Sequence, residues 1–350
     1  MGGRTLSTST VFDTYWRFAA ERQAIYEARL AGDAGPWTKD PILAAYRFTN
    51  CYRAADRVSQ YLIRNVSYAG EQSWREVFFR TMLFKSFNRI STWELLHGRL
   101  GPLAWAEYDF ARYDKVLTGA FEAGSRLYSA AYVVPPPALG ERRKHSNHLR
   151  LLEHMMNTGA PETLQACTSM RDAFEALRSY PAVGDFLAYQ YLIDLNYSAG
   201  LGFDEMDFVV PGPGARDGIR KCFGTGADGI EAQVIRYMAD TQAEHFARLG
   251  LTFHGLRGRA LQLIDCQNLF CEVDKYARVA HPEVAGISGR SRIKQSYRRD
   301  PAALPAWFPP KWHINDQVPV TREAPRVHRG RRGLSNVSSS AMVVASTSSP

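Results

Sequence analysis

Apolar residues recur at helical spacing through most of this chain. Phe12, Tyr15, Trp16 and Ala19 open the first such segment, and similar segments follow one another to about residue 279. Breaks that contain glycine or proline separate these segments. Alternating patterns of the kind that form strands are scarce. The sequence therefore predicts a mainly α fold, with one helical domain over residues 11–282.

The excess positive charge of the chain lies near its C-terminus. The 350 residues carry 43 Lys and Arg against 35 Asp and Glu, and residues 290–332 alone hold 11 against 3. The rest of the chain, at 32 against 32, is formally neutral. A basic extension over residues 283–332 is expected to seek a polyanion such as nucleic acid, unless it is a solvated segment without a partner. The Ser-rich residues 333–350 are expected to be a disordered tail.

Several classes of protein are disfavoured by the composition. No apolar run approaches the roughly 20 residues of a membrane helix, and the N-terminus lacks the apolar region of a signal peptide. We therefore expect a cytoplasmic protein with no membrane partner. The five cysteines are scattered, without a Cys-x-x-Cys pair or histidines at ligand spacing. Neither a metal site nor a cofactor is predicted.

A short break between two helical segments is the first candidate site. The sequence YPAVGDFLA covers residues 180–188, and its helix resumes directly after Gly184. The first amides of a helix lack partners within it, and the helix dipole there favours an anion. We therefore expect the backbone of Val183 and Gly184 to bind a DNA phosphate. A simple turn between two helices is the alternative.

These residues resemble the helix-hairpin-helix element of the helical DNA glycosylase superfamily, whose pattern is Leu-Pro-Gly-Val-Gly-x-x-x-Ala. Tyr180 stands for the leucine and Ala182 for the first glycine, which suggests a slightly different hairpin backbone. The resemblance implies a helix-hairpin-helix DNA glycosylase-like fold, with a catalytic aspartate roughly twenty residues beyond Gly184. Asp204 lies at that distance, and Asp207 follows it.

A narrower resemblance covers residues 11–278. The segments YWRFAAERQAIYEARLAG, FFRTMLFKSFNRISTWELL and LIDCQNLFCEVDKYAR, among others, resemble the helical domain of 5-hydroxymethyldeoxyuridine DNA kinases. They also resemble the related α-glutamyl/putrescinyl-thymine pyrophosphorylases. The resemblance implies a role in the hypermodified pyrimidines of phage DNA. The kinases add a P-loop domain, and this sequence has no G-x-x-x-x-G-K-[ST] motif, so we do not expect it to supply kinase chemistry itself.

Asp207 and Asp204 are the predicted catalytic residues. A carboxylate beside an extruded nucleotide can stabilise positive charge on the sugar, or it can remove a proton from a nucleophile. Either aspartate could instead cap the next segment. Phe186 occupies the position where glycosylases with lyase activity carry a lysine, so no lyase activity is expected.

The segment PGPGARDGIRK, residues 211–221, is a second candidate phosphate site. Backbone amides at Gly212 and Gly214 could hold a phosphate, assisted by the side chains of Arg216 and Lys221. Pro-Gly pairs also mark ordinary turns, and this alternative stays open.

Two further segments supply polar side chains for recognition of an extruded base or of phosphate. The candidates for base recognition, each of which could instead be a packing residue, are Asn50, Tyr52, Gln60, Asp265, Gln267 and Asn268. Arg53 and Arg57 lie one helical turn apart and are expected either to bind phosphate or to serve a structural role.

The predicted function is that of a DNA-binding enzyme acting on a flipped, modified pyrimidine, with duplex DNA as its partner. By resemblance to the pyrophosphorylases, it would transfer an amine or amino-acid co-substrate to a 5-hydroxymethyluracil derivative. One alternative is a monofunctional glycosylase that excises a hydroxymethylated or glucosylated pyrimidine, for example in defence against phage. A DNA-binding module without catalytic activity is the second alternative.

Overall fold

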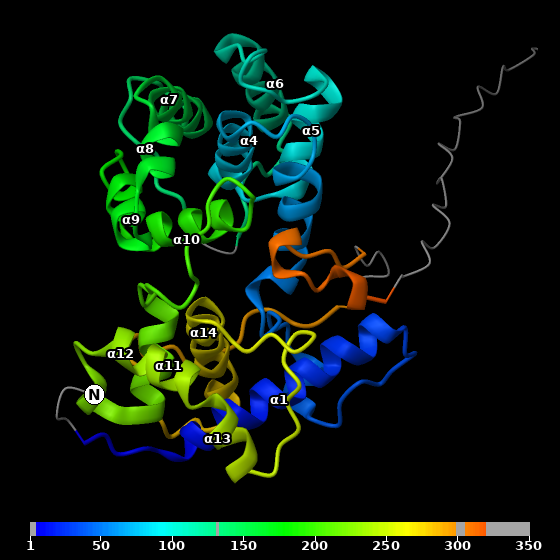
Figure 1. Ribbon diagram of the computed structural model, residues 1–350, viewed down its shortest axis with the longest axis vertical. Coiled ribbons are helices and arrows are strands. Elements are labelled where there is room, and N and C mark those ends of the chain that lie inside the picture. The colour runs from blue at the N-terminus through cyan, green and yellow to red at the C-terminus, as the bar shows by residue number, and fades with distance from the viewer. Residues whose placement is uncertain (1–4, 131–132, 299–304, 320–350) are drawn as a thin grey trace, which may run out of the picture.

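The computed structural model describes residues 5–130, 133–298 and 305–319. These residues confirm the mainly helical fold, and within them no β-strand forms, only two isolated β-bridges. The helices gather into an upper and a lower lobe (Figure 1). None of the helices in these ranges is long and apolar enough to span a bilayer.

The lower lobe is built around one long helix, α14. This helix contacts α1, α11 and α12, and its apolar face, which includes Phe270 at 0% exposure, forms the centre of the lobe. The helices of the lobe are α1 (Thr10–Ala31), α11 (Pro213–Phe223), α12 (Glu231–Asp240), α13 (Gln242–Arg248) and α14 (Leu263–Ala280), with a 3-10 turn, η3 (Gly224–Ala227), after α11.

Glycines bring α11 and α14 into backbone contact. A Cβ atom on Gly218 would lie 2.1 Å from the carbonyl oxygen of Phe270, and one on Gly214 would lie 3.1 Å from the Sγ atom of Cys271. Any larger residue at Gly218 would collide with the α14 backbone. The two glycines are one helical turn apart on α11 and form the face that packs on α14.

The upper lobe contains seven helices, with α4 at its centre. Helix α4 contacts α5, α7, α8 and α10, and all but two of its fourteen residues are buried. The helices are α4 (Trp74–Phe87), α5 (Ile90–Leu100), α6 (Phe110–Glu122), α7 (Lys144–Asn157), α8 (Ala160–Ala166), α9 (Met170–Arg178) and α10 (Asp185–Asn196). Helices α9 and α10 are the two arms of the expected hairpin, and they pack on each other.

Short helical elements connect the two lobes near the N-terminus. They are α2 (Pro41–Ala45), the 3-10 turn η1 (Arg53–Ala55), α3 (Arg57–Leu62) and the π-helical turn η2 (Ile63–Ser67), which leads into α4. Both α2 and η1 contact α14, so this segment lies against the lower lobe before it enters the upper one.

The described parts of the basic extension lie against the helical body. Phe308 and Ile314 are buried at 0% and 5% exposure, and two 3-10 turns, η4 (Pro310–Trp312) and η5 (Asn315–Gln317), follow each other there. The Lys311 ammonium donates to the carbonyl oxygens of Leu201, at 2.9 Å, and Asn196. The remainder of the extension, and the tail expected to be disordered at residues 333–350, lie outside the described residues.

The contact between α11 and α14 predicts unequal effects of two glycine substitutions. Gly218→Ala should lower the free energy of unfolding by about 2 kcal/mol or more, because the added methyl overlaps the Phe270 carbonyl. Gly119→Ala in α6, where a Cβ meets nothing within 4 Å, should raise it by about 0.5–1 kcal/mol. Urea unfolding of the two variants measures both effects. Equal effects would contradict this packing.

Candidate functional site

The turn between α9 and α10 reaches the protein surface. Pro181, Ala182 and Gly184 are exposed, while the Val183 side chain is buried and anchors the turn in the core. Ala182 has a φ of 60°, so the left-handed conformation is present although the residue is not glycine. Gly184 is the N-cap residue of α10, with a φ of −78°, and it has no side chain to accept a hydrogen bond from the first amides of the helix. Helix α10 therefore starts at exposed backbone, at Gly184 and Asp185.

Two details of the turn bear on the expected phosphate site. The amide of Val183 donates to the carbonyl oxygen of Tyr180 at 3.1 Å, so this amide is already used within the turn. The first residue of α10 is Asp185, whose exposed carboxylate lies 3.4 Å from the Arg178 guanidinium. That carboxylate interacts favourably with the helix dipole and would repel an incoming phosphate. The backbone amides of the exposed Gly184 and Asp185 are the donors that the proposed contact can use.

Both predicted catalytic aspartates lie in the loop between α10 and α11 and are exposed. The Asp204 carboxylate accepts a hydrogen bond from the Met206 amide at 2.9 Å. The Asp207 carboxylate accepts one from the Met170 amide, at the start of α9, at 3.3 Å. Each carboxylate thus accepts one backbone hydrogen bond and belongs to an exposed residue.

The aspartates and the hairpin turn are separated by the length of α9. Asp207 contacts the first residue of α9, whereas the turn with Gly184 follows the last. Nine residues at about 1.5 Å each make this helix about 13 Å long, roughly four base-pair steps of B-form DNA. A phosphate held at Gly184 and a nucleotide at Asp207 would therefore not be neighbours on an unbent strand.

The carboxylate between the two aspartates, Glu205, is buried. It accepts hydrogen bonds from the Arg259 guanidinium at 2.8 Å and the Trp312 indole at 3.1 Å. Burial raises the pKa of Glu205, and Arg259 and Lys311 oppose that rise. Glu205 therefore joins the acidic loop to the C-terminal segment.

The candidate phosphate site on α11 is largely closed by packing. Gly212 is buried, and a Cβ there would lie 3.1 Å from the Phe186 ring; Gly214 packs on α14. Lys221 is 2% exposed and pairs with Asp274 at 3.1 Å, so its ammonium does not reach a phosphate at the surface, contrary to the prediction. Arg216 is exposed and is the residue of this set that solvent reaches most freely.

Two of the side chains expected to recognise a base are engaged inside the protein. The Tyr52 hydroxyl donates to the carbonyl oxygen of Arg259 at 2.6 Å. The Gln60 amide group donates to the carbonyl oxygen of Ala54 and accepts from the amide of Trp307, both at 2.6 Å. Both side chains are buried, and these bonds occupy the groups that a base edge would need.

Three further base-recognition candidates lie on α14. Asp265 is buried and caps the helix by accepting from the Gln262 amide at 3.1 Å, and burial raises the pKa of Asp265 to about 7. Gln267 is buried and donates to the Sγ atom of Cys271 at 3.3 Å. Asn268 is partly exposed. The structure thus gives Asp265 a structural role and brings Gln267 next to Cys271.

For Arg53, the structure supports the structural alternative. Its guanidinium pairs with both carboxylate oxygens of Asp194, at 2.5 and 2.8 Å, and donates to Gln190 at 3.1 Å. Lys85 reaches the same carboxylate at 2.8 Å. Although burial opposes ionisation, these two cations hold the pKa of Asp194 below its ordinary value. The Arg53 amide also donates to Asp265, at 2.9 Å.

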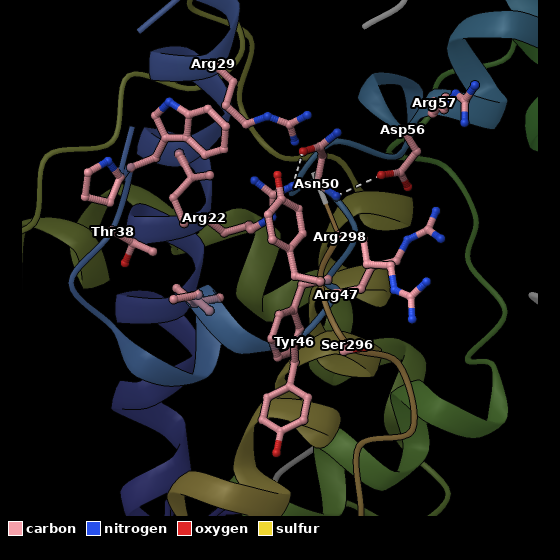
Figure 2. A pocket seen from close by; sticks show the side chains of 17 residues that line it. Arg22, Arg29, Thr38, Tyr46, Arg47, Asn50, Asp56, Arg57, Ser296 and Arg298 are labelled. Carbon is pink, nitrogen blue, oxygen red and sulfur yellow. Dashed lines mark hydrogen bonds between the residues drawn. The ribbon is translucent and has the colours of Figure 1, made fainter. Parts of the chain in front are cut away.

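A pocket of about 670 Å³ lies beside the segment that carries Asn50 and Arg57. We call it the arginine-lined pocket, because five guanidinium groups line it: Arg22, Arg29, Arg47, Arg57 and Arg298. Figure 2 shows these side chains around the cavity, with Arg22 reaching from α1 toward Asn50. The sequence prediction included Asn50 and Arg57 but missed the other four arginines.

The C-terminal segment closes one side of this pocket. Tyr46 and Ser296 form an isolated antiparallel bridge, and the Tyr297 amide donates to the carbonyl oxygen of Ala45 at 2.9 Å. This pairing brings Arg298 beside residues more than two hundred positions earlier in the chain. The pocket therefore depends on a long-range contact.

Asn50 and Asp56 fix the inner wall of the pocket. The backbone amide of Asn50 donates to the Asp56 carboxylate at 2.8 Å. The side-chain amide of Asn50 donates to the carbonyl oxygen of Ala55 at 2.7 Å and accepts a hydrogen bond from Arg22. Burial raises the pKa of Asp56 to about 7, although the Asn50 amide opposes the rise. With its side chain engaged on both sides, Asn50 positions Arg22.

One sequence signal for the pocket was available. Arg22 falls on the apolar stripe of α1 that includes Tyr15 and Ala19, where a charged residue is costly unless it is satisfied. Arg29, Arg47 and Arg298 give no such signal, because exposed arginines are common everywhere.

A family model described as the helical domain of 5-hmdU DNA kinase matches residues 9–286 of the chain. The chain belongs to this family. It is also similar to the 5-hmdU DNA kinase of Bacillus phage SP10, with 28% identity over 287 residues. That match covers 76% of this chain and 45% of the phage protein, so the chain spans less than half of its relative. No solved structure matches the chain.

The matched residues contain the hairpin, both aspartates and all the pocket arginines except Arg298. The mainly helical architecture agrees with the helical domain named by the model, while the glycosylase-like topology stays a prediction.

The buried cluster of Arg53, Lys85 and Asp194 predicts a large loss of stability when the charge of Asp194 alone is removed. Asp194→Asn keeps the shape but leaves two buried cations without their anion, so the free energy of unfolding should fall by about 3–5 kcal/mol. Asp185→Asn removes an exposed carboxylate and should cost less than about 0.5 kcal/mol. Urea unfolding monitored by circular dichroism compares the two variants. Similar small losses in both would show that the cluster is not needed.

Proposed function

We propose that this chain is the DNA-recognition part of an enzyme that acts on a modified pyrimidine in DNA. The observation that carries the proposal is the surface position of the hairpin, where α10 begins with open amides at Gly184. Such a helix start favours an anion, and the regularly spaced anion of DNA is its phosphate. Family membership supports the choice of DNA as the partner.

The name of the phage relative supports the class of base. That protein is named a 5-hmdU DNA kinase, so we propose a 5-hydroxymethyl pyrimidine as the base in the DNA that this chain binds. The sequence holds no G-x-x-x-x-G-K-[ST] motif. The proposal therefore gives these residues the recognition of the strand and does not assign phosphoryl transfer to them.

Substitution of Gly184 tests the DNA contact. Gly184→Asp should weaken binding to a duplex that carries 5-hydroxymethyluracil by about tenfold or more, because a carboxylate at the N-cap would repel the phosphate and compete for the same amides. The variant should fold normally, since a Cβ at this position meets nothing within 4 Å and aspartate is a good N-cap. Fluorescence anisotropy at fixed salt concentration measures the affinity.

Gly184→Ser is the matched control for this experiment. Serine caps a helix as well as aspartate does but adds no charge, so its affinity should stay within about threefold of the original. Equal affinities of the aspartate and serine variants would overturn the proposed phosphate contact at the hairpin.

A second candidate function assigns chemistry to the chain itself. The exposed carboxylates of Asp204 and Asp207 in one short loop favour it. As a transferase, either residue would deprotonate an amine or amino-acid co-substrate that displaces a leaving group from the 5-methylene of the pyrimidine. As a glycosylase, it would stabilise positive charge on the sugar while the N-glycosidic bond breaks.

Asp207→Asn tests this second candidate, with Asp204→Asn beside it. Duplexes that contain 5-hydroxymethyluracil, 5-hydroxymethylcytosine or its glucosylated form are incubated with the chain and then treated with alkali. Strand breaks that disappear in one variant indicate the glycosylase. Intact strands with a heavier nucleoside, formed only from a pyrophosphorylated substrate and an amine, indicate the transferase. DNA that stays unchanged in every reaction would contradict the second candidate.

A further inference from the structure

We propose that the arginine-lined pocket binds the phosphate group of a nucleotide. None of the residues that line it belongs to α9, α10 or the turn between them, so the site is distinct from the hairpin. The ligand chemistry is a phosphate ester attached to a flat ring system. Its source is either a free mononucleotide or a nucleotide within a DNA strand.

The charge of the pocket is the first argument. Five guanidinium groups line the cavity with one carboxylate, that of Asp56. Within residues 5–130, 133–298 and 305–319, no ion pair is formed by Arg29, Arg47 or Arg298. Guanidinium groups bind phosphate oxygens through paired hydrogen bonds, and several of them around one cavity select for a multiply charged anion.

Arg22 supplies the second argument. It is 7% exposed, and it donates hydrogen bonds to two neutral acceptors, the Thr49 carbonyl oxygen at 3.0 Å and the Asn50 side chain. Its Nη1 atom is buried without a hydrogen-bond partner among the described residues. Burial lowers the pKa of Arg22, while Asp56 and Glu272 oppose this shift. A buried cation of this kind is costly until an anion reaches it.

The size and walls of the pocket supply the third argument. Its volume of about 670 Å³ is far larger than a single phosphate and falls within the range of small-molecule sites. Trp37, Tyr46, Phe48 and Tyr297 contribute aromatic rings to the lining. The Tyr297 hydroxyl is buried and has no hydrogen-bond partner in the described part of the chain. Aromatic rings can stack on a base while the arginines hold its phosphate.

Binding of thymidine 5′-monophosphate to the full chain tests the proposal. Isothermal titration calorimetry should detect binding of thymidine 5′-monophosphate and no binding of thymidine, which lacks the phosphate. Arg22→Met should abolish the signal. Because a substitution at a buried residue can disturb folding, the double variant Arg29→Ser with Arg47→Ser is also made at the pocket rim, and its Kd should rise at least about tenfold.

Arg126→Ser is the control for an arginine-to-serine change outside the pocket, since this arginine is exposed and does not line the cavity; it removes one positive charge, and the double variant removes two. Its Kd should be unchanged. The hairpin proposal is tested on affinity for duplex DNA and this one on mononucleotide binding, so failure of the hairpin proposal leaves this one intact.

A twelve-nucleotide single strand separates the two sources of phosphate. Binding of the strand but not of the mononucleotide, with the same loss in the Arg29 and Arg47 double variant, would support the pocket as a site for a nucleotide within DNA. Two results would overturn the proposal: no binding of either ligand, or binding that the double variant retains at the strength of the Arg126 control.

Discussion

The buried carboxylate of Asp194 is the point on which the arrangement of the two lobes depends. It lies on α10 and accepts contacts from Lys85 of α4 and from Arg53 of the connecting segment. The Arg53 amide also bonds to Asp265 at the start of α14. Burial lowers the pKa of Lys85 to about 8, and Asp194 opposes that shift. Three ionic groups that are costly to bury alone are satisfied only when the connecting segment packs on the upper lobe, and the Arg53 amide ties that segment to the lower lobe.

The same connection positions the wall of the arginine-lined pocket. The segment of residues 46–57 is held at one end by Arg53 and at the other by the bridge between Tyr46 and Ser296. Between these two points, the backbone amide of Asn50 donates to Asp56 and its side-chain oxygen accepts from Arg22. The geometry of the pocket thus follows from the ionic cluster on one side and from the C-terminal segment on the other.

The helical architecture could be predicted because helical periodicity is a local property of the sequence. The exposure of Gly184 and the two aspartates also follows from local breaks. The roles of Gly214 and Lys221 were not accessible in the same way, because their partners lie on α14, some fifty residues further along. A Pro-Gly-Pro-Gly run has the same appearance whether it cradles a phosphate or starts a closely packed helix. The pocket escaped prediction because Arg298 and the α1 arginines line one cavity only in the folded chain.

The two proposed anion sites differ in what they can contribute to recognition. The hairpin offers neutral amides at the surface, where water and salt weaken any attraction and every phosphate of a strand is equivalent. The pocket offers a buried guanidinium at Arg22 and enclosing aromatic walls, where electrostatic attraction is stronger and shape matters. On these proposals, the hairpin places the chain on DNA without regard to sequence. Selection among nucleotides then falls to the pocket, because only there do charge and ring shape act on the same ligand.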